Sequence, residues 1–552
     1  MRMNTLHAPV NAALLGVAAR SQLTWTQADA LGIIREGRRP HPSTFPVSNP
    51  LTREPLECDR SPDHIADFPV DWYDPRDLVV PERFDFGAKN IYARLREKSV
   101  ECDWGRMVYL FHLAIWNQFF ERVPRKASEA DFLNSFHQIL DATRMAPGRG
   151  LYSLIPLARN GAPVNGAHRI VSALQLDKSV ACVKTEISPE SCNYNYRFFV
   201  DQFRDAGQLP HLKSLASDVF DAMALDICRL LPNIAIAVKY PAARGHNDEV
   251  DRILSEHASI FYKKAVTFRN DGPTELIRTV YEGARWLGTH KCDFEGARDK
   301  AASCFAHRGP AYFYLLAFED PADLVRAKER VRHLFRISHH SMHITDTRGE
   351  ALCLAKLAFS NNSIRFANLR SQKEMRNFER LFSIYRAALS SVDDADDFCI
   401  DGSAVMSAYG IRDCRDLDFI CHGGQSILQL SDSLIASHNG YARYYAPKTL
   451  DDIIYDHRNH FWVSGVKFAT LANVRAWKAA RGEPKDHEDV ALINAGCATG
   501  PLNVVLTNCR LAAKRFQRSF RSRVRAMLLS RAGRPLNWLR KRITRAMREG
   551  GK

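Results

Sequence analysis

Along the middle of the chain, apolar and polar positions alternate in a way that predicts strands followed by helices. Residues 311–318 (AYFYLLAF) are almost entirely apolar over the length of a strand, which is typical of a buried strand. A helical pattern follows, which begins at Asp320 and ends at Phe335, and another covers residues 348–360. These elements predict an α/β region over residues 206–390.

The same order of apolar run, polar turn and helix occurs on both sides of this region. In residues 155–173 (IPLARNGAPVNGAHRIVSA), a strand, a turn and a second strand lead to a helix that opens at Asn165. In residues 400–421 (IDGSAVMSAYGIRDCRDLDFIC), an apolar strand ends at a Gly-Ser pair, and a helix and a second strand follow. The first 75 residues lack such periodicity, so we expect a flexible or partly ordered extension there.

Two aspartates, Asp416 and Asp418, stand two residues apart on the second strand of the 400–421 segment. Side chains at this spacing point to one face of a strand, so the two carboxylates should converge. Paired oxygen ligands suit Mg2+, which proteins commonly hold with one or two carboxylates together with substrate phosphates. Gly402 lets a phosphate approach the backbone, and Ser403 and the following amides can bind it at a helix N-terminus.

This combination resembles the signature of the polymerase-β-like nucleotidyltransferase superfamily, over about a fifth of the chain. The resemblance implies an NTP substrate and Mg2+ ions held by Asp416 and Asp418, which neutralise the triphosphate and activate the acceptor. It also implies a third carboxylate on a later strand. Asp451, Asp452 and Asp456 are all open candidates, and we favour Asp452 with Asp456 second.

Basic residues near this segment are candidates for binding the triphosphate. Residues 474–493 (VRAWKAARGEPKDHEDVALI) resemble the basic helix and Lys-Asp motif of many minimal members of the superfamily. This resemblance makes Lys485 the first candidate and Lys467 and Lys478 weaker ones. Arg412, six residues before Asp418, could contribute to the site or could be a surface residue.

The upstream segment resembles the phosphate-binding motif of the ParB and sulfiredoxin superfamily. Gly166, His168 and Arg169 at a helix start would bind an anion through backbone amides, the helix dipole and a guanidinium group. Because some members hydrolyse nucleotides or transfer phosphate from them, the resemblance implies a kinase-like or NTPase activity in residues 76–205. Ala167 occupies the place of the sulfiredoxin cysteine, which argues against sulfinic-acid repair. Plain helix capping is the alternative interpretation.

A group of histidines and acids in the middle region invites a metal-site interpretation. It consists of His339, His340, His343, Asp346 and Glu350. His340 and His343 would face opposite sides of a strand, and the Asp-Thr pair that follows is an ordinary helix start. We therefore favour a cationic substrate-binding patch over a metal site.

Composition and cysteine usage narrow the class of protein. The 552 residues, 45% hydrophobic and 25% charged, are typical of a soluble protein with several domains. No apolar run approaches the roughly 18 residues of a membrane span, and residues 12–19 (AALLGVAA) lack the length and cleavage site of a secretory signal. The 13 cysteines contain no C-x-x-C pair, which indicates neither a zinc site nor a disulfide framework. We expect a cytoplasmic protein with reduced cysteines.

The net charge of +15 is concentrated at the C-terminal end. Residues 510–552 contain fifteen Lys and Arg against one acid, so the preceding residues carry only +1. Trp538, Leu539 and other apolar residues alternate with arginines at near-helical spacing, interrupted at residues 533–535, which predicts two short basic amphipathic helices. We expect them to bind an anionic membrane surface at the inner membrane face. A nucleic-acid-binding arm is less favoured because it needs no apolar stripe, and packing on the protein's own core is a further alternative.

Together these patterns predict an α/β (α+β) multidomain protein. Its expected parts are an extension (1–75), a ParB/sulfiredoxin-like nucleotide-binding domain (76–205), an α/β middle region (206–390), a nucleotidyltransferase domain (391–500) and a basic amphipathic tail (501–552). The expected activity is Mg2+-dependent nucleotidyl transfer to a small acceptor, such as a sugar or polyol phosphate, in surface-polysaccharide metabolism. Nucleotidylation of a protein or antibiotic is one alternative, and a non-catalytic, nucleotide-sensing DNA-binding protein is another.

Overall fold

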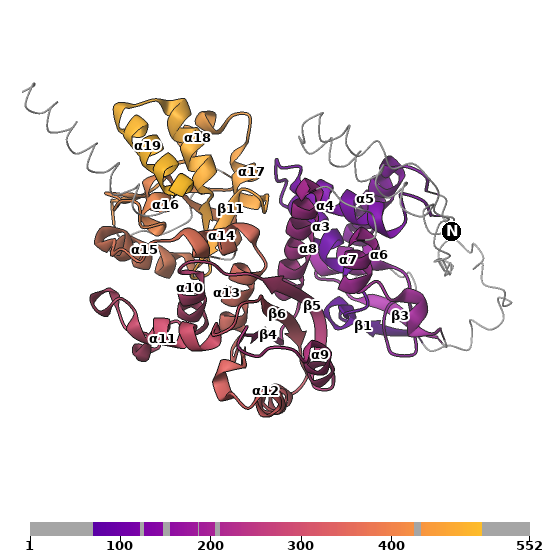
Figure 1. Cartoon of the computed structure of the whole chain (residues 1–552). Coiled ribbons are helices and arrows are strands. Elements are labelled where there is room, and N and C mark those ends of the chain that lie inside the picture. The colour runs from indigo at the N-terminus through magenta and orange to yellow at the C-terminus, as the bar shows by residue number, and fades with distance from the viewer. Residues whose placement is uncertain are drawn as a thin grey trace, which may run out of the picture. The chain divides into compact units, whose positions relative to one another are not determined.

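The computed structural model describes residues 70–121, 126–146, 155–185, 187–204, 210–392, 394–423 and 432–499. These residues form a mixed α/β structure with three separate sheets, which confirms the expected class (Figure 1). The chain divides into two compact units, residues 1–473 and 474–552. Residues 1–69 of the predicted extension (1–75) and the whole predicted basic tail (501–552) lie outside the described residues. Within the described ranges, no helix is both long and apolar enough to cross a membrane.

The N-terminal part of the first unit combines a small sheet with five helices. Its strands lie in the order β1 (Val70–Tyr73), β3 (Val180–Lys184) and β2 (Ile155–Leu157), with β1 antiparallel and β2 parallel to β3. The helices are α3 (Asp85–Glu97), α4 (Trp104–Trp116), α5 (Glu129–Met145), α6 (Ala167–Gln175) and α7 (Tyr196–Arg204). Because α4 is apolar on nearly every side, most of it is buried.

The predicted second strand of the 155–173 segment is reduced to a single bridge between Leu157 and Pro163. A proline has no N–H group to donate to a strand ladder, so the pairing does not extend through this position. The turn is instead closed by backbone bonds, from Ala158 N to Ala162 O at 2.8 Å and from Val164 N to the carbonyl of β2.

The middle region contains a four-stranded antiparallel sheet in the order β5-β6-β4-β7. The elements are β4 (Ile234–Lys239), α9 (Asn247–Ser255), β5 (Ser259–Val266), β6 (Ala311–Ala317), α12 (Pro321–Phe335) and β7 (Met342–Ile344). This succession and strand order are those of the split βαβ, ferredoxin-like topology. Helices α10 (Gly272–Val280) and α11 (Glu295–Cys304) are inserted between β5 and β6.

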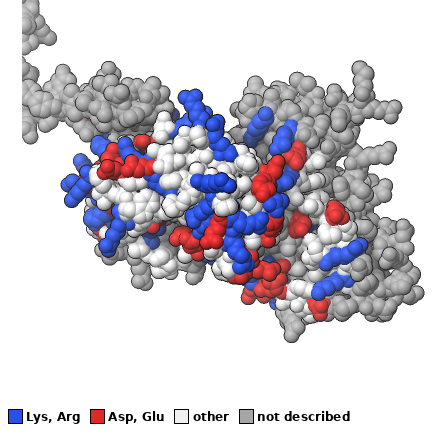
Figure 2. All heavy atoms as spheres, turned by 60° about the horizontal axis from the view of Figure 1, so that its bottom comes forward, with Lys and Arg blue, Asp and Glu red and all other residues white. Residues whose placement is uncertain are grey.

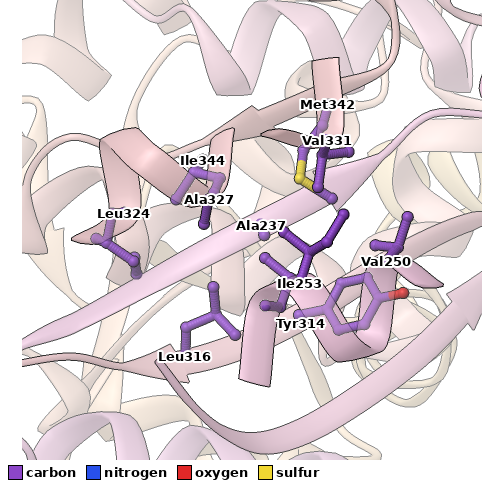
Figure 3. Packing of buried hydrophobic residues seen from close by; sticks show 12 residues of the cluster. Ala237, Val250, Ile253, Tyr314, Leu316, Leu324, Ala327, Val331, Met342 and Ile344 are labelled. Atoms are coloured by element: carbon purple, nitrogen blue, oxygen red, sulfur yellow. The ribbon is translucent and has the colours of Figure 1, made fainter. Parts of the chain in front are cut away.

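One face of this sheet carries a continuous hydrophobic core. Ala237, Tyr314 and Leu316 of the strands pack with Val250 of α9 and Val331 of α12 (Figure 3). On β4, the alternate positions are buried too. Helix α13 (Arg348–Ala358) packs against this strand, and α8 (Pro210–Leu230) packs against α13. Burial on both sides explains why β4 is largely apolar without alternation.

Element predictions in this region are confirmed with small shifts of boundary. Residues 311–318 form β6, and the helix predicted from Asp320 is α12, where the Asp320 carboxylate accepts the Ala322 N–H at 2.9 Å. The helix predicted over residues 348–360 is α13, which begins with a capping box formed by Thr347 and Glu350.

The C-terminal part of the first unit is built on a five-stranded mixed sheet. Its order is β10 (Ile435–Ser437), β9 (Leu417–Cys421), β8 (Phe398–Asp401), β12 (Val466–Ala469) and β11 (His460–Val463). β8 is antiparallel to β9 and parallel to β12, and β10 is parallel to β9. The helices are α14 (Asn361–Leu369), α15 (Arg376–Leu389), α16 (Gly402–Ala408) and α17 (Leu450–Tyr455).

Helix α18 (Leu471–Arg481) crosses the boundary between the two units, and α19 (Pro484–Thr499) belongs to the second. Gly482, with a φ of 69°, ends α18 in the left-handed conformation that terminates many helices. The buried Asp486 accepts hydrogen bonds from Arg481 Nε and Nη2, both at 2.7 Å. This pair joins the two helices across a two-residue link.

Candidate functional site

The strand, Gly-Ser turn, helix and second strand predicted for residues 400–421 are present as β8, α16 and β9. Asp401, the last residue of β8, is the register partner of Asp418 on β9. Gly402 opens α16 with a φ of 64°, and a Cβ atom at this position would lie 2.8 Å from Oδ2 of Asp418. The start of the helix therefore lies directly against the Asp418 carboxylate.

The two predicted metal ligands differ in position and exposure. Asp418 is the second residue of β9 and is half-buried, whereas Asp416 is exposed and precedes the first residue of that strand. Ser403, the second residue of α16, is buried. Arg412 donates from Nη1 to the Asp413 carbonyl at 3.0 Å.

A further carboxylate and a histidine, which the sequence patterns do not indicate, lie beside Asp418. Asp401 is fully buried, and Nδ1 of His438 lies 3.3 Å from its Oδ2. Nε2 of the same ring lies 3.9 Å from Oδ2 of Asp418, so the imidazole stands between the two carboxylates. His438 directly follows β10. Its backbone N–H donates to the backbone carbonyl of Phe419 on β9 at 2.6 Å, which keeps the residue at this end of the sheet.

Tyr445 completes the surroundings of the buried carboxylate. Burial, and then the charge of Asp401, raise the pKa of Tyr445 well above its ordinary value. The phenol therefore keeps its proton at neutral pH. His438 and Tyr445 both lie beyond residue 431, far from Asp401 in sequence. The one sequence signal for this part of the site is an aspartate immediately before the Gly-Ser pair.

The three candidates for the third carboxylate all have partners around α17. Asp452 accepts the Thr449 N–H at 2.8 Å in a capping box, and both carboxylate oxygens of Asp456 accept hydrogen bonds from the Arg458 side chain. Asp451 bonds to His422 at 2.9 Å. His422 follows the last residue of β9, four residues beyond Asp418, which is about 13 Å along a strand. The assignment of Asp452 stays a prediction, because capping and metal binding call for the same residue type.

The candidate basic ligands occupy three different surroundings. Lys467 on β12 is 4% exposed and donates to the carbonyls of Asp396 at 2.6 Å and Ile454 at 2.8 Å. Burial lowers the pKa of Lys467 to about 7. In the second unit, Lys478 pairs with Asp489 at 2.9 Å, and the exposed Lys485 lies 3.3 Å from Glu483.

Of the three residues predicted to bind an anion at the upstream turn, the structure brings two together, Gly166 and Arg169. Gly166 caps α6 with a φ of 84°, and Nη2 of Arg169 lies 3.0 Å from the place of a Cβ atom on it, so the guanidinium folds over the turn. Burial lowers the pKa of Arg169 to about 10. His168 instead bonds through Nε2 to the Tyr109 hydroxyl at 2.9 Å, and burial lowers its pKa well below the ordinary value.

A buried charge cluster behind this turn was not indicated by the sequence. Arg83 holds Asp85 with two bonds of 2.9 Å and donates to Pro163 O at 2.7 Å. Lys89 pairs with the same carboxylate and lies 3.2 Å from Nε2 of His112. The cluster ties α3 to the turn before Gly166. In the sequence, its residues look like part of the polar face of an ordinary helix, so the pattern does not indicate that they are buried together.

The N-terminal part meets the C-terminal sheet at the end opposite Asp401 and Asp418. Lys98 pairs with Asp394 at 2.7 Å and Asp397 at 2.6 Å, just before β8 begins. The Glu101 N–H donates to Asp451 at 2.7 Å. The α3–α4 turn therefore contacts the sheet at the end where β8 begins. These contacts do not involve the end with the Gly-Ser turn.

In the described ranges, no three His, Cys, Asp or Glu side chains are grouped so that they could hold a metal ion. All cysteines described are free, and most are buried. The chain matches no protein-family model, no curated protein and no solved structure.

Proposed function

We propose that this protein is a Mg2+-dependent nucleotidyltransferase that transfers a nucleotidyl group from an NTP to a small acceptor, such as a sugar or polyol phosphate. One observation carries the proposal: α16 starts against the Asp418 carboxylate, with only the hydrogen of Gly402 between them. A helix N-terminus attracts phosphate, and a carboxylate attracts the metal ion that accompanies a triphosphate. A metal–nucleotide complex would need both groups side by side, one for the phosphates and one for the metal ion.

The available oxygen donors fit Mg2+. Asp416 and Asp418 are accessible carboxylates, and Mg2+ commonly takes one or two carboxylates and completes its shell with water and phosphate oxygens. When bound, the ion would neutralise the triphosphate and lower the pKa of the acceptor hydroxyl. The amides at Gly402 and Ser403 would orient the phosphates, and His438 would hold Asp418 in place through its bridge to Asp401.

A second phosphate-handling site at the upstream turn belongs to the same proposal. The left-handed Gly166, the N-terminus of α6 and the guanidinium of Arg169 lie together. In this role Arg169 would bind a nucleotide phosphate, and the domain would prepare a phosphorylated acceptor. His168 would position the helix through Tyr109 and would not touch the ligand.

The test is a screen for pyrophosphate release from each NTP, with Mg2+ and a pool of sugar and polyol phosphates. Asp416→Asn and Asp418→Asn should each reduce release by more than about 100-fold, the scale of losing a principal electrostatic group. Asp299→Asn, an exposed carboxylate of α11, is the matched control and should leave the rate unchanged. Folding of each variant is checked by circular dichroism. Full activity in the double variant Asp416→Asn/Asp418→Asn would refute the proposal.

A further inference from the structure

The free edge of the middle sheet gathers polar side chains from several elements. β7 is the edge strand beside β4, α12 packs against it, and α11 packs against the short helix η6 (Ser338–His340) that precedes it. Here we define the β7-edge cluster as Tyr240, Tyr281, Lys300, Arg332, His340 and His343. Tyr240 follows β4 and Tyr281 caps α10, so the cluster draws on distant parts of the chain.

Among the described residues, no carboxylate forms an ion pair with Arg332, whereas its basic neighbours on the same helix are paired. The other basic residues that precede it on α12 are paired: Arg326 with Asp323, Lys328 with Asp346 and Arg330 with Glu256. Nε of Arg332 is buried without a hydrogen-bond partner in the described part of the chain. A half-buried guanidinium without a counter-charge is costly, because the group loses hydration without compensation.

A second cation, Lys300, lies near enough to Arg332 for the two charges to interact. Nζ of Lys300 donates to His339 O at 2.8 Å and lies 3.4 Å from Nδ1 of His340. It also lies 6.0 Å from the centre of the Tyr281 ring. No carboxylate of the described residues forms an ion pair with Lys300. Burial lowers the pKa of Lys300, and the charge of Arg332 lowers it further.

His343, Tyr281 and Tyr240 add uncharged side chains that can donate hydrogen bonds. His343 is 7% exposed, and its Nε2 is buried without a hydrogen-bond partner among the described residues. Burial lowers the pKa of His343 to about 4, so the ring is neutral at pH 7. Burial also raises the pKa of Tyr281 to about 12 and that of Tyr240 well above its ordinary value, so both phenols keep their protons.

We propose that the β7-edge cluster is a binding site for the phosphate group of a small phosphorylated molecule. Two cations without an ion-pair partner in the described ranges, together with several uncharged donors, are the groups that bind an oxyanion. Arg332 can bind it through two parallel hydrogen bonds. The exposed ring of Trp286 lies edge-on to Tyr281 at 5.1 Å, which supplies an apolar surface for the organic part of the ligand. This site is separate from the proposed transferase site and does not depend on that activity.

The test is calorimetric titration of the full-length protein with phenyl phosphate at fixed ionic strength. We expect saturable binding that Arg332→Gln weakens by about tenfold or more, as for the loss of a charge-assisted hydrogen bond. Lys300→Gln, on a different helix, should weaken binding in the same way, which guards against a folding defect in one variant. Arg330→Gln is the matched control on α12 and should bind like the parent.

A second readout follows His343 directly. Histidine carbon-13 NMR should show its pKa rising from about 4 when phenyl phosphate binds, because a nearby anion favours the imidazolium form. The signal is assigned with His343→Gln. Equal affinity of the parent and both cluster variants, or binding that leaves the His343 signal unchanged, would overturn the proposal.

Discussion

At Gly402 the absence of a side chain allows the backbone turn to contact a carboxylate. The φ of 64° is left-handed, and a Cβ atom would approach Asp418 Oδ2 to 2.8 Å. Two separate constraints therefore exclude other residues here. One is backbone strain, and the other is displacement of the residue proposed to bind the metal.

We expect Gly402→Ala to lower the free energy of unfolding by about 1–3 kcal/mol, from strain and crowding together. It should also reduce pyrophosphate release, because Asp418 must move. Urea denaturation and the release assay measure the two effects. Gly349→Ala is the control, since the nearest atom would lie 3.9 Å away in the first turn of α13. A fully active, equally stable Gly402→Ala protein would contradict the described contact.

The buried Lys467 predicts a particular dependence of stability on pH. Its folded-state pKa of about 7 lies below the ordinary value of 10.5, so between these values the unfolded chain binds the additional proton. The free energy of unfolding should therefore rise with pH in this window, by up to about 1.4 kcal/mol per pH unit from this residue. Lys467→Met should lose that part of the slope in urea denaturation at pH 7, 8 and 9. Identical slopes in the two proteins would argue against a neutral, buried lysine.

At the scale of elements, the sequence patterns predicted those helices and strands that local apolar periodicity determines. β6, α12, α13 and the β8-α16-β9 unit follow from apolar spacing, caps and the Gly-Ser pair. Asp401 and His438 could not be predicted as neighbours of Asp418, because strand register and the position of β10 bring them together. The aspartates of α17 were ambiguous for a different reason, since a helix cap and a metal site favour the same side chain.

The α3–α4 turn is expected to stabilise the C-terminal sheet. Lys98→Ala would remove the half-buried cation that pairs with both Asp394 and Asp397, at a cost of about 1–2 kcal/mol, between the values for exposed and buried pairs. Hydrogen exchange should then increase at the end of α3 and the start of β8. Lys213→Ala, an exposed position on α8, is the control. Unchanged exchange in both regions would show that this contact is not stabilising.

For the whole molecule, the distribution of charge separates the tail from the rest. On the face shown in Figure 2, basic and acidic side chains of the described residues are interspersed. This agrees with the net charge of only +1 for the chain before residue 510, against +14 from there to the end. A long-range attraction to anionic surfaces is therefore expected from the tail.

The full chain should co-sediment with anionic vesicles and not with neutral ones, at about 1 kcal/mol per basic residue near the surface. A chain that ends at Asn508 should lose this binding. Trp538→Ser with Leu539→Ser should weaken it, because insertion of the apolar stripe adds to charge. Equal sedimentation of both chain lengths, or binding to DNA but not to vesicles, would reject the membrane role.

The central claim is that the chain moves a nucleotidyl group at the Asp416 and Asp418 site. The most direct measurement follows phosphorus label placed at either the α or the γ position of the NTP, with Mg2+ and the acceptor pool present. The account predicts that α label enters the acceptor, that γ label appears in pyrophosphate, and that Asp418→Asn abolishes both transfers. Label from the γ position in the acceptor, or α-label transfer that survives in Asp416→Asn/Asp418→Asn, would contradict it.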